Sequence, residues 1–158
     1  MEKLGNKLKI KKKLGVLGGS FDPAHKGHLA ISKEAIKKFK LKKIIWAITK
    51  KNPLKKSSKN SINKRIKSCK KIKRKNHFIN VKFYEDLIRS NKTINLINFH
   101  KWHKWKIISK KCKIVVFDRQ GYKKKSLNSL SFKRLNGKNL KFVEFNKVNI
   151  SSSQLRKI

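Results

Sequence analysis

The chain has 158 residues, which is enough for one domain with one hydrophobic core. Its 46 lysine and arginine residues against 7 acidic ones give a formal net charge of +39. No apolar run reaches the ~18 residues of a membrane-spanning helix, and the basic first residues contain no apolar signal segment. Two cysteines, Cys69 and Cys112, are too few for a disulfide framework or a structural zinc site. We therefore expect a cytoplasmic protein without a membrane partner.

The high charge has two interpretations. Strongly basic proteins often bind nucleic acid, acidic membranes or phosphorylated molecules. However, 40 of the 46 basic residues are lysine, and lysine, asparagine and isoleucine together make up 72 of the 158 residues, as AT-rich codons would produce. Arginine, which binds phosphates and bases better than lysine, occurs only six times. This composition favours codon bias over a specific nucleic-acid partner.

The predicted elements alternate between strands and helices. A basic lead-in over residues 1–13 precedes the first of them. In chain order we expect a strand at 14–17, a helix at 27–39, a strand at 43–49, a helix at 62–73, a strand at 78–84, a helix at 102–111, strands at 114–117 and 140–145, and a helix over 151–158. This alternation predicts βαβ units, and thus an α/β domain with a mostly parallel sheet over residues 14–158.

The segment between the first strand and the first helix, GGSFDPAHKGH over residues 18–28, is a candidate phosphate site. Ligands of α/β sheets bind at the carboxyl ends of strands, and paired glycines followed by a helix start bring backbone N–H groups close to an anion. His25 and His28 can share one face of that helix start and donate hydrogen bonds to a phosphorus centre. The alternatives are surface histidines or a metal pair, for which Asp22 alone does not complete a ligand set.

Three motifs, in this order, resemble the HxGH nucleotidyltransferase superfamily and, within it, the bacterial nicotinate-nucleotide adenylyltransferases. They are GGSFDPAHKGH, the NPLK element at residues 52–55, and ISSSQLR at residues 150–156. The resemblance covers residues 14–158 and implies a Rossmann-like fold. It also implies transfer of AMP from ATP to nicotinate mononucleotide, which gives deamido-NAD and pyrophosphate.

The resemblance also implies a role for each motif residue. Catalysis would fall to His25, His28 and Arg156. The ATP phosphates would bind to Gly18, Gly19, Ser20, Phe21, Lys55, Ser151, Ser152 and Ser153. Nicotinate mononucleotide would bind to Thr49, Asn52 and Trp102, with the indole of Trp102 stacked on the pyridine ring. Mg²⁺ would arrive with ATP rather than in a protein metal site. Without the resemblance, the serines would be an ordinary helix N-cap, and Trp102 and Trp105 would pack in the core.

In one place the chain is shorter than this family. Residues 92–95 resemble the start of a family helix, and residues 96–99 resemble the end of the segment that follows the next strand. The rest of that helix, the next strand and the turn after it therefore have no counterpart in this chain. The resemblance implies that the missing strand would lie beside the first strand, in the centre of the sheet. Residues 85–93 alone are too few for a parallel crossover, which needs a dozen or more residues.

Several alternatives remain open from the sequence. In the first, the sheet is rearranged; in the second, the missing strand is supplied in another way; in the third, the chain is an inactive, internally deleted homologue. Another HxGH nucleotidyltransferase, such as the phosphopantetheine type, and a basic nucleic-acid-binding protein are the other candidates. The sequence predicts no oligomeric state.

Overall fold

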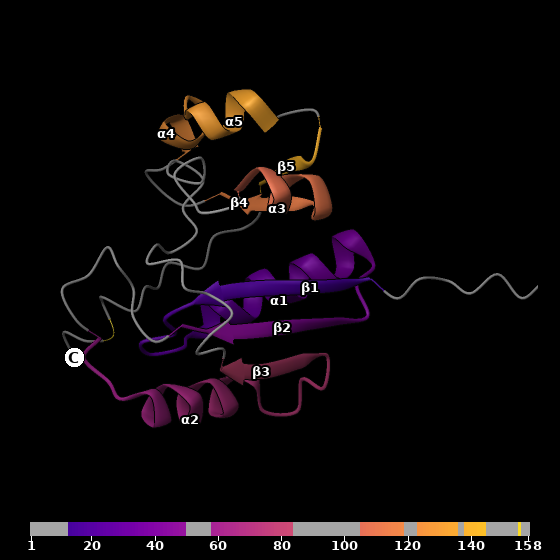
Figure 1. The fold of residues 1–158 in the computed structure, drawn as a ribbon. Helices are drawn as coiled ribbons and strands as arrows, with labels where there is room; N and C mark the ends of the chain where they lie inside the picture. Colours follow the sequence, from indigo (N-terminus) through magenta and orange to yellow (C-terminus); the bar gives the residue numbers. More distant parts are fainter. Residues whose placement is uncertain are drawn as a thin grey trace, which may run out of the picture.

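The structure, a computed structural model, describes residues 13–49, 58–83, 105–118, 123–135, 138–144 and Leu155. Its strands form two parallel sheets (Figure 1). The first sheet has the strand order β1-β2-β3. Its strands and the helices that connect them are β1 (Leu14–Gly19), α1 (Lys26–Phe39), β2 (Lys43–Ile48), α2 (Ile62–Lys73) and β3 (Ile79–Phe83). The second sheet pairs β4 with β5. In chain order, its strands and the helices of this part of the chain are α3 (Trp105–Lys111), β4 (Ile114–Phe117), α4 (Lys123–Leu127), α5 (Leu130–Leu135) and β5 (Leu140–Val143).

The α/β class is confirmed, and the predicted elements lie close to their expected places. β1 extends two residues farther than expected, into the glycine pair. Of the helix expected over 151–158, only Leu155 is described, and it is helical. The sequence analysis missed α4 and α5, which lie between the parallel strands β4 and β5.

β2 lies at the centre of the first sheet because it is apolar on both faces. Its sequence, KIIWAI, is typical of a parallel strand that is covered on both sides. Trp46 and Ile48 have no exposed surface, and Ala47 between them is 1% exposed. Ala35 of α1 and Cys69 of α2 belong to the same buried cluster as Trp46, so both helices cover the face of the sheet that Trp46 occupies.

A short chain of hydrogen bonds attaches α1 to β2. The indole Nε1 of Trp46 donates to Oγ of Ser32 at 2.8 Å, and Ser32 Oγ donates to the carbonyl oxygen of His28 at 2.8 Å. Both side chains are fully buried. The first turns of α1 are therefore held at a defined height above the strand.

β1 forms one edge of the first sheet in the described part of the chain. Leu17 is in register with Trp46 and packs against the same core. Because side chains alternate along a strand, Leu14 and Val16 point to the opposite face, where they are 60% and 70% exposed.

No strand of the described ranges lies between β1 and β4, and residues 84–104, which contain the segment that the sequence analysis found shortened, lie outside those ranges. The β4–β5 sheet lies on the β1 side of the first sheet (Figure 1). Phe117, the last residue of β4, packs against the core cluster of the first sheet. The two sheets therefore contact each other through apolar side chains, while they remain separate sheets.

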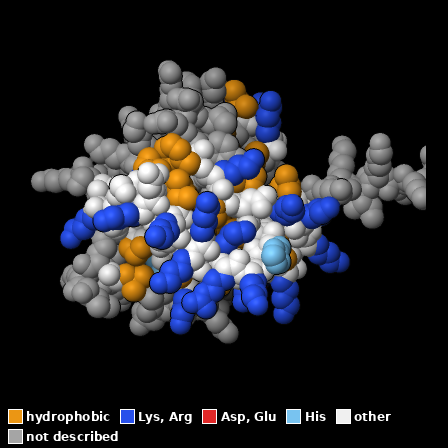
Figure 2. Space-filling model, turned by 90° about the horizontal axis from the view of Figure 1, so that it is seen from below, with side chains coloured by type: hydrophobic (Ala, Val, Ile, Leu, Met, Phe, Trp, Pro, Cys, Tyr) orange, Lys and Arg blue, Asp and Glu red, His pale blue; other side chains and the backbone are white. Residues whose placement is uncertain are grey.

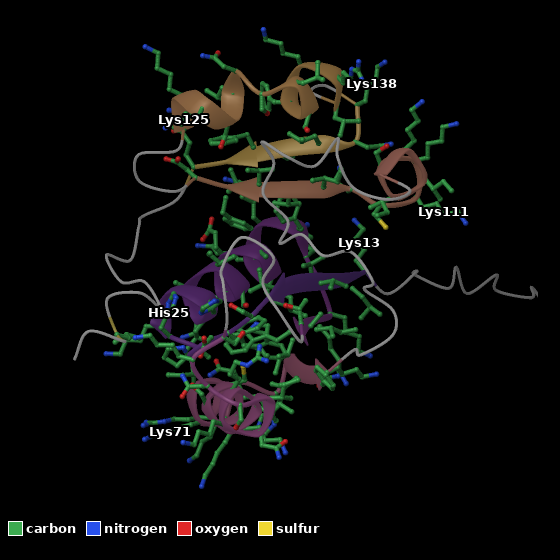
Figure 3. All side chains as sticks on the ribbon, turned by 60° about the vertical axis from the view of Figure 1, so that its left-hand side comes forward. Lys13, His25, Lys71, Lys111, Lys125 and Lys138 are labelled. Atoms are coloured by element: carbon green, nitrogen blue, oxygen red, sulfur yellow. The ribbon has the colours of Figure 1, made fainter. Side chains whose placement is uncertain are left out.

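Basic side chains are numerous on the face of the molecule that Figure 2 shows. Figure 2 shows lysine and arginine side chains distributed over one face of the molecule, with hydrophobic groups between them. In Figure 3, Lys71 of α2 and Lys125 of α4 point away from the protein. No helix among the described residues is long and apolar enough to cross a bilayer.

We predict that Ser32→Ala destabilises the protein by about 1–3 kcal/mol, because the buried indole N–H of Trp46 loses its acceptor. Urea unfolding measures this change in the free energy of unfolding. Lys33→Ala, at the next and exposed position of α1, is the matched control and is expected to stay within about 0.5 kcal/mol of wild type. Equal stabilities for the two variants would contradict the proposed role of Ser32.

Candidate nucleotide-binding site

The turn after β1 lies where the first sheet presents its carboxyl ends. β1 ends at Gly19, which is in register with Ile48 at the end of β2. The backbone then turns through Phe21, which has a left-handed φ of 46° and a side chain that is 1% exposed. The Phe21 ring stacks on Trp46 with the centroids 5.2 Å apart. Packing of the ring thus compensates for a backbone conformation that costs on the order of 1 kcal/mol in a residue other than glycine.

His25 and His28 cap α1 reciprocally. Nδ1 of His25 accepts a hydrogen bond from the backbone N–H of Gly27 at 3.2 Å, and Nδ1 of His28 accepts one from the backbone N–H of His25 at 3.2 Å. The ring centroids are 3.9 Å apart. This is the geometry of a capping box with two imidazoles in the places of the usual serine and glutamate. Figure 3 shows His25 at this end of α1.

The cap determines which ring nitrogen carries the proton. A nitrogen that accepts a hydrogen bond from an N–H group is unprotonated, so each neutral imidazole carries its proton on Nε2. Both histidines are thereby prepared to donate a hydrogen bond from Nε2. An oxyanion of a phosphate group is the natural acceptor for such a pair.

Burial keeps His28 neutral. The pKa of His28 is lowered from 6.5 to about 3, first by burial and then by the nearby His25, while a backbone hydrogen bond with His25 partly opposes the shift. The ring of His28 also lies 4.7 Å from the ring of Phe21. At neutral pH His28 is therefore an uncharged donor in an apolar setting.

Asp22 attaches the turn to the start of α2. Its Oδ2 accepts from the backbone N–H of Lys59 at 3.0 Å, and its Oδ1 accepts from the backbone N–H and the side-chain amide of Asn60 at 3.2 and 2.7 Å. The Asp22 side chain is 4% exposed. Ser61, which caps α2, follows directly.

Arg65 reaches from α2 to the carboxyl ends of two strands. Its Nη1 donates to the carbonyl oxygen of Ser20 at 2.8 Å and to that of Thr49 at 2.7 Å. The residue is 2% exposed. Burial lowers its pKa, and the nearby Asp22 carboxylate opposes this shift.

The structure brings together seven of the residues that the sequence analysis proposed for the site. They are Gly18, Gly19, Ser20, Phe21, His25, His28 and Thr49. Thr49 donates from Oγ1 to the carbonyl oxygen of Gly19 at 3.4 Å and thus lies directly beside the turn. Because the Phe21 ring is buried, only its backbone can serve a ligand. The other proposed residues lie outside the described ranges: Asn52, Lys55, Trp102, Ser151, Ser152, Ser153 and Arg156.

The sequence analysis assigned no role to Arg65 or to the pair formed by Ser32 and Trp46. One signal was present, because arginine is rare in this lysine-rich chain and Arg65 occupies an otherwise apolar side of a helix. Its two acceptors, however, lie 45 and 16 residues away along the chain. Among the described residues, no three His, Cys, Asp or Glu side chains gather in a way that would hold a metal ion.

Parallel β–α–β units with a glycine turn and a helix start at their carboxyl edge are the arrangement of a nucleotide-binding α/β domain. Comparison with known proteins agrees, since the cytidylyltransferase-like family model matches residues 16–158. A probable nicotinate-nucleotide adenylyltransferase from Pelagibacter ubique is 57% identical over 180 aligned positions that cover both chains completely. One from Ruegeria is 31% identical and is aligned over 68% of each chain.

The chain therefore belongs to the nicotinate-nucleotide adenylyltransferase family. Among solved structures, the nicotinic acid mononucleotide adenylyltransferase of Plasmodium falciparum, complexed with NaAD, matches with a TM-score of 0.64. That match has 16% sequence identity and covers 92% of this chain and 83% of the other. The family, the fold class and the nucleotidyltransferase activity predicted from the motifs are thus confirmed.

The alignment with the Pelagibacter protein also bears on the length of the chain. It spans 180 positions, whereas this chain has 158 residues, so at least 22 positions of that relative have no counterpart here.

We predict that His28 makes the protein less stable in acid. Its folded-state pKa lies below the value of 6.5 expected in the unfolded chain, so below pH 6.5 protons bind preferentially to the unfolded state. This linkage lowers the free energy of unfolding by about 2 kcal/mol between pH 7 and about pH 5. The free energy of unfolding falls further as the pH approaches the folded-state pKa.

Urea unfolding at the two pH values tests this prediction. His28→Gln preserves an acceptor for the backbone N–H of His25 but does not titrate, so its stability is expected to change less with pH. His77→Gln, at an exposed histidine, is the control and is expected to retain the wild-type pH dependence. Identical pH dependence in His28→Gln and wild type would contradict the assignment.

Proposed function

We propose that the protein transfers the adenylyl group of ATP to nicotinate mononucleotide. The observation that supports this most directly is the reciprocal cap of His25 and His28, which presents two Nε2–H donors beside a phosphate turn. The family to which the chain belongs supports the choice of both substrates.

The proposed reaction requires no protein nucleophile. An oxygen of the mononucleotide 5′-phosphate attacks the α-phosphorus of ATP. The new P–O bond forms as the bond from the α-phosphorus to the bridging oxygen of pyrophosphate breaks, and that oxygen leaves with the electron pair. Positioning and stabilisation of developing charge then supply the catalysis. His25 and His28 donate hydrogen bonds to the phosphate oxygens without any change in their own charge.

Residues outside the described ranges would complete the site. We assign the ATP phosphates to Lys55, Ser151, Ser152, Ser153 and Arg156, together with the turn over residues 18–21. We assign nicotinate mononucleotide to Thr49, Asn52 and Trp102. Thr49 supports this assignment because its hydroxyl lies within 3.4 Å of the Gly19 carbonyl oxygen, at the edge of the turn. Mg²⁺ would enter with ATP, since phosphate oxygens are ligands that this hard cation prefers. We place the reaction in the cytoplasm and invoke no nucleic-acid or membrane partner.

Release of pyrophosphate by the purified protein tests the function. ATP and Mg²⁺ are supplied with nicotinate mononucleotide, nicotinamide mononucleotide or phosphopantetheine in parallel reactions. We expect turnover with nicotinate mononucleotide and little with the other two. Turnover with phosphopantetheine alone would refute the proposed acceptor.

One observation favours a second candidate, an inactive homologue that still folds. At least 22 positions of the Pelagibacter relative are absent from this chain, and no strand of the described residues joins β1 to β4. Absence of turnover with all three acceptors, from a protein with cooperative thermal unfolding, would favour this candidate.

We predict that His25→Ala and His28→Ala each reduce kcat by about 100-fold or more, since each removes one donor from the developing charge. Steady-state pyrophosphate release measures the effect. His77→Ala, which removes an exposed histidine at the turn before β3, is the matched control and is expected to leave kcat unchanged. Wild-type kcat in either of the first two variants would refute the role of that histidine.

We predict that one glycine substitution in β1 raises the KM for ATP without changing stability, and that another lowers stability without changing this KM. A Cβ on Gly18 would meet no described atom within 4 Å, so Gly18→Ala is expected to change stability by less than about 0.5 kcal/mol. The same methyl group would intrude on a nucleotide that lies against the bare backbone, and the KM for ATP is expected to rise about tenfold.

Gly15→Ala is the control for this experiment. Its Cβ would lie 2.8 Å from Cδ1 of Leu41, so the variant is expected to lose stability and keep its KM for ATP. An unchanged KM in Gly18→Ala would mean that ATP does not approach this part of the strand.

A further inference from the structure

Arg65 is a buried cation that the proposed reaction does not use directly. Its guanidinium lies beneath the turn, 2% exposed, where Nη1 serves the carbonyl oxygens of Ser20 and Thr49. Removing a guanidinium from water is costly, and apolar side chains of similar size often replace buried charges without loss of stability. A buried arginine at this place therefore calls for a role other than stability.

The hydrogen bond to Ser20 determines where the next N–H group points. The only cis peptide bond in the described residues joins Asp22 to Pro23, so the bond between Ser20 and Phe21 is trans. In a trans peptide the C=O and the following N–H point in opposite directions. Because Arg65 holds the Ser20 oxygen toward α2, the N–H of Phe21 is directed away from α2.

The peptide group before Phe21 and the Phe21 ring are both fixed in position, and the Phe21 N–H donates no hydrogen bond within the described structure. Arg65 holds the oxygen of its peptide group, while Trp46 and His28 hold its ring, with centroids 5.2 and 4.7 Å away. No described residue accepts a hydrogen bond from the Phe21 N–H. Hydrogen bonds in series polarise one another, so a cation on the oxygen side makes this N–H a stronger donor.

The position of Arg65 itself is secured by the turn that it supports. The Asp22 carboxylate lies near enough to oppose the lowering of the Arg65 pKa. Its hydrogen bonds to Lys59 and Asn60 hold the residues that directly precede α2. Ser61 then caps the helix by accepting from the backbone N–H of Lys64, one residue before Arg65. These contacts fix the start of α2, and with it Arg65, relative to the turn.

We propose that Arg65 is a positioning residue, which orients and polarises the peptide between Ser20 and Phe21 so that the Phe21 N–H binds a phosphate group of ATP. The proposal rests on the proposed function in that ATP is taken as the ligand. Arg65 acts through the backbone and does not touch the nucleotide.

Arg65→Met is the principal test, because methionine fills similar space without a charge or a donor. Titration of purified protein with MgATP, followed by calorimetry, gives the dissociation constant, and thermal unfolding gives the stability. We expect Arg65→Met to bind MgATP about tenfold more weakly at an unchanged or modestly shifted Tm. Arg134→Met, which removes an exposed arginine from α5, is the matched control and is expected to bind like wild type. Wild-type affinity in Arg65→Met would overturn the proposal.

Steady-state kinetics separate positioning from general damage. In Arg65→Met we expect the KM for ATP to rise and kcat to fall, while the KM for nicotinate mononucleotide stays within about twofold of wild type. Equal increases in both KM values would indicate a merely structural role and overturn the proposal. Arg65→Lys keeps the charge and some donor capacity, so it is expected to recover part of the affinity, and it serves for the comparison if Arg65→Met does not fold.

The same experiment distinguishes this proposal from the proposed function. A wild-type protein that binds MgATP but releases no pyrophosphate would refute the enzyme activity, and the comparison of Arg65→Met with Arg134→Met would still decide the role of Arg65. A wild-type protein that binds no MgATP would overturn both proposals.

Discussion

The site depends on a single buried cation beneath the carboxyl ends of β1 and β2. Arg65 satisfies the carbonyl oxygens of Ser20 and Thr49, which the sheet leaves without partners as its strands end. Asp22 supplies the opposite charge and binds the backbone that leads into α2. Turn, sheet and helix are thus joined by polar contacts around the turn after β1. A purely apolar contact would not direct the backbone groups of the turn, since apolar packing has no preferred hydrogen-bond direction.

The histidine pair shows how one arrangement of atoms serves both the fold and the proposed chemistry. Each Nδ1 is used to cap α1, so each Nε2 retains the proton of the neutral ring. The cap thereby selects the tautomer that the reaction needs. Burial against Phe21 keeps His28 uncharged at neutral pH, so it stabilises a developing negative charge as a dipole and not as an ion.

β1, α1, β2 and α2 contain every described residue that positions the turn and the two histidines. The second sheet is separate, and Phe117 links it to the first core through apolar contact. Leu14 and Val16 of β1 are exposed on the face of the first sheet opposite its core. The described chain thus contains the β1–β3 sheet and the turn after β1, while at least 22 positions of its Pelagibacter relative have no counterpart in this chain.

The sequence by itself determined the local features of this protein. Hydrophobic periodicity located β1 to β5 and the helices α1 to α3, and three short motifs, the glycine turn with its two histidines first among them, identified the family. Both signals depend on residues that are neighbours along the chain. The sequence analysis missed α4 and α5, which have only five and six residues and are therefore too short to show a helical period. Only the tertiary structure revealed the roles of Arg65, Ser32 and Trp46. Their partners lie 14 to 45 residues away, and no local pattern specifies which distant carbonyl or hydroxyl a buried donor will meet.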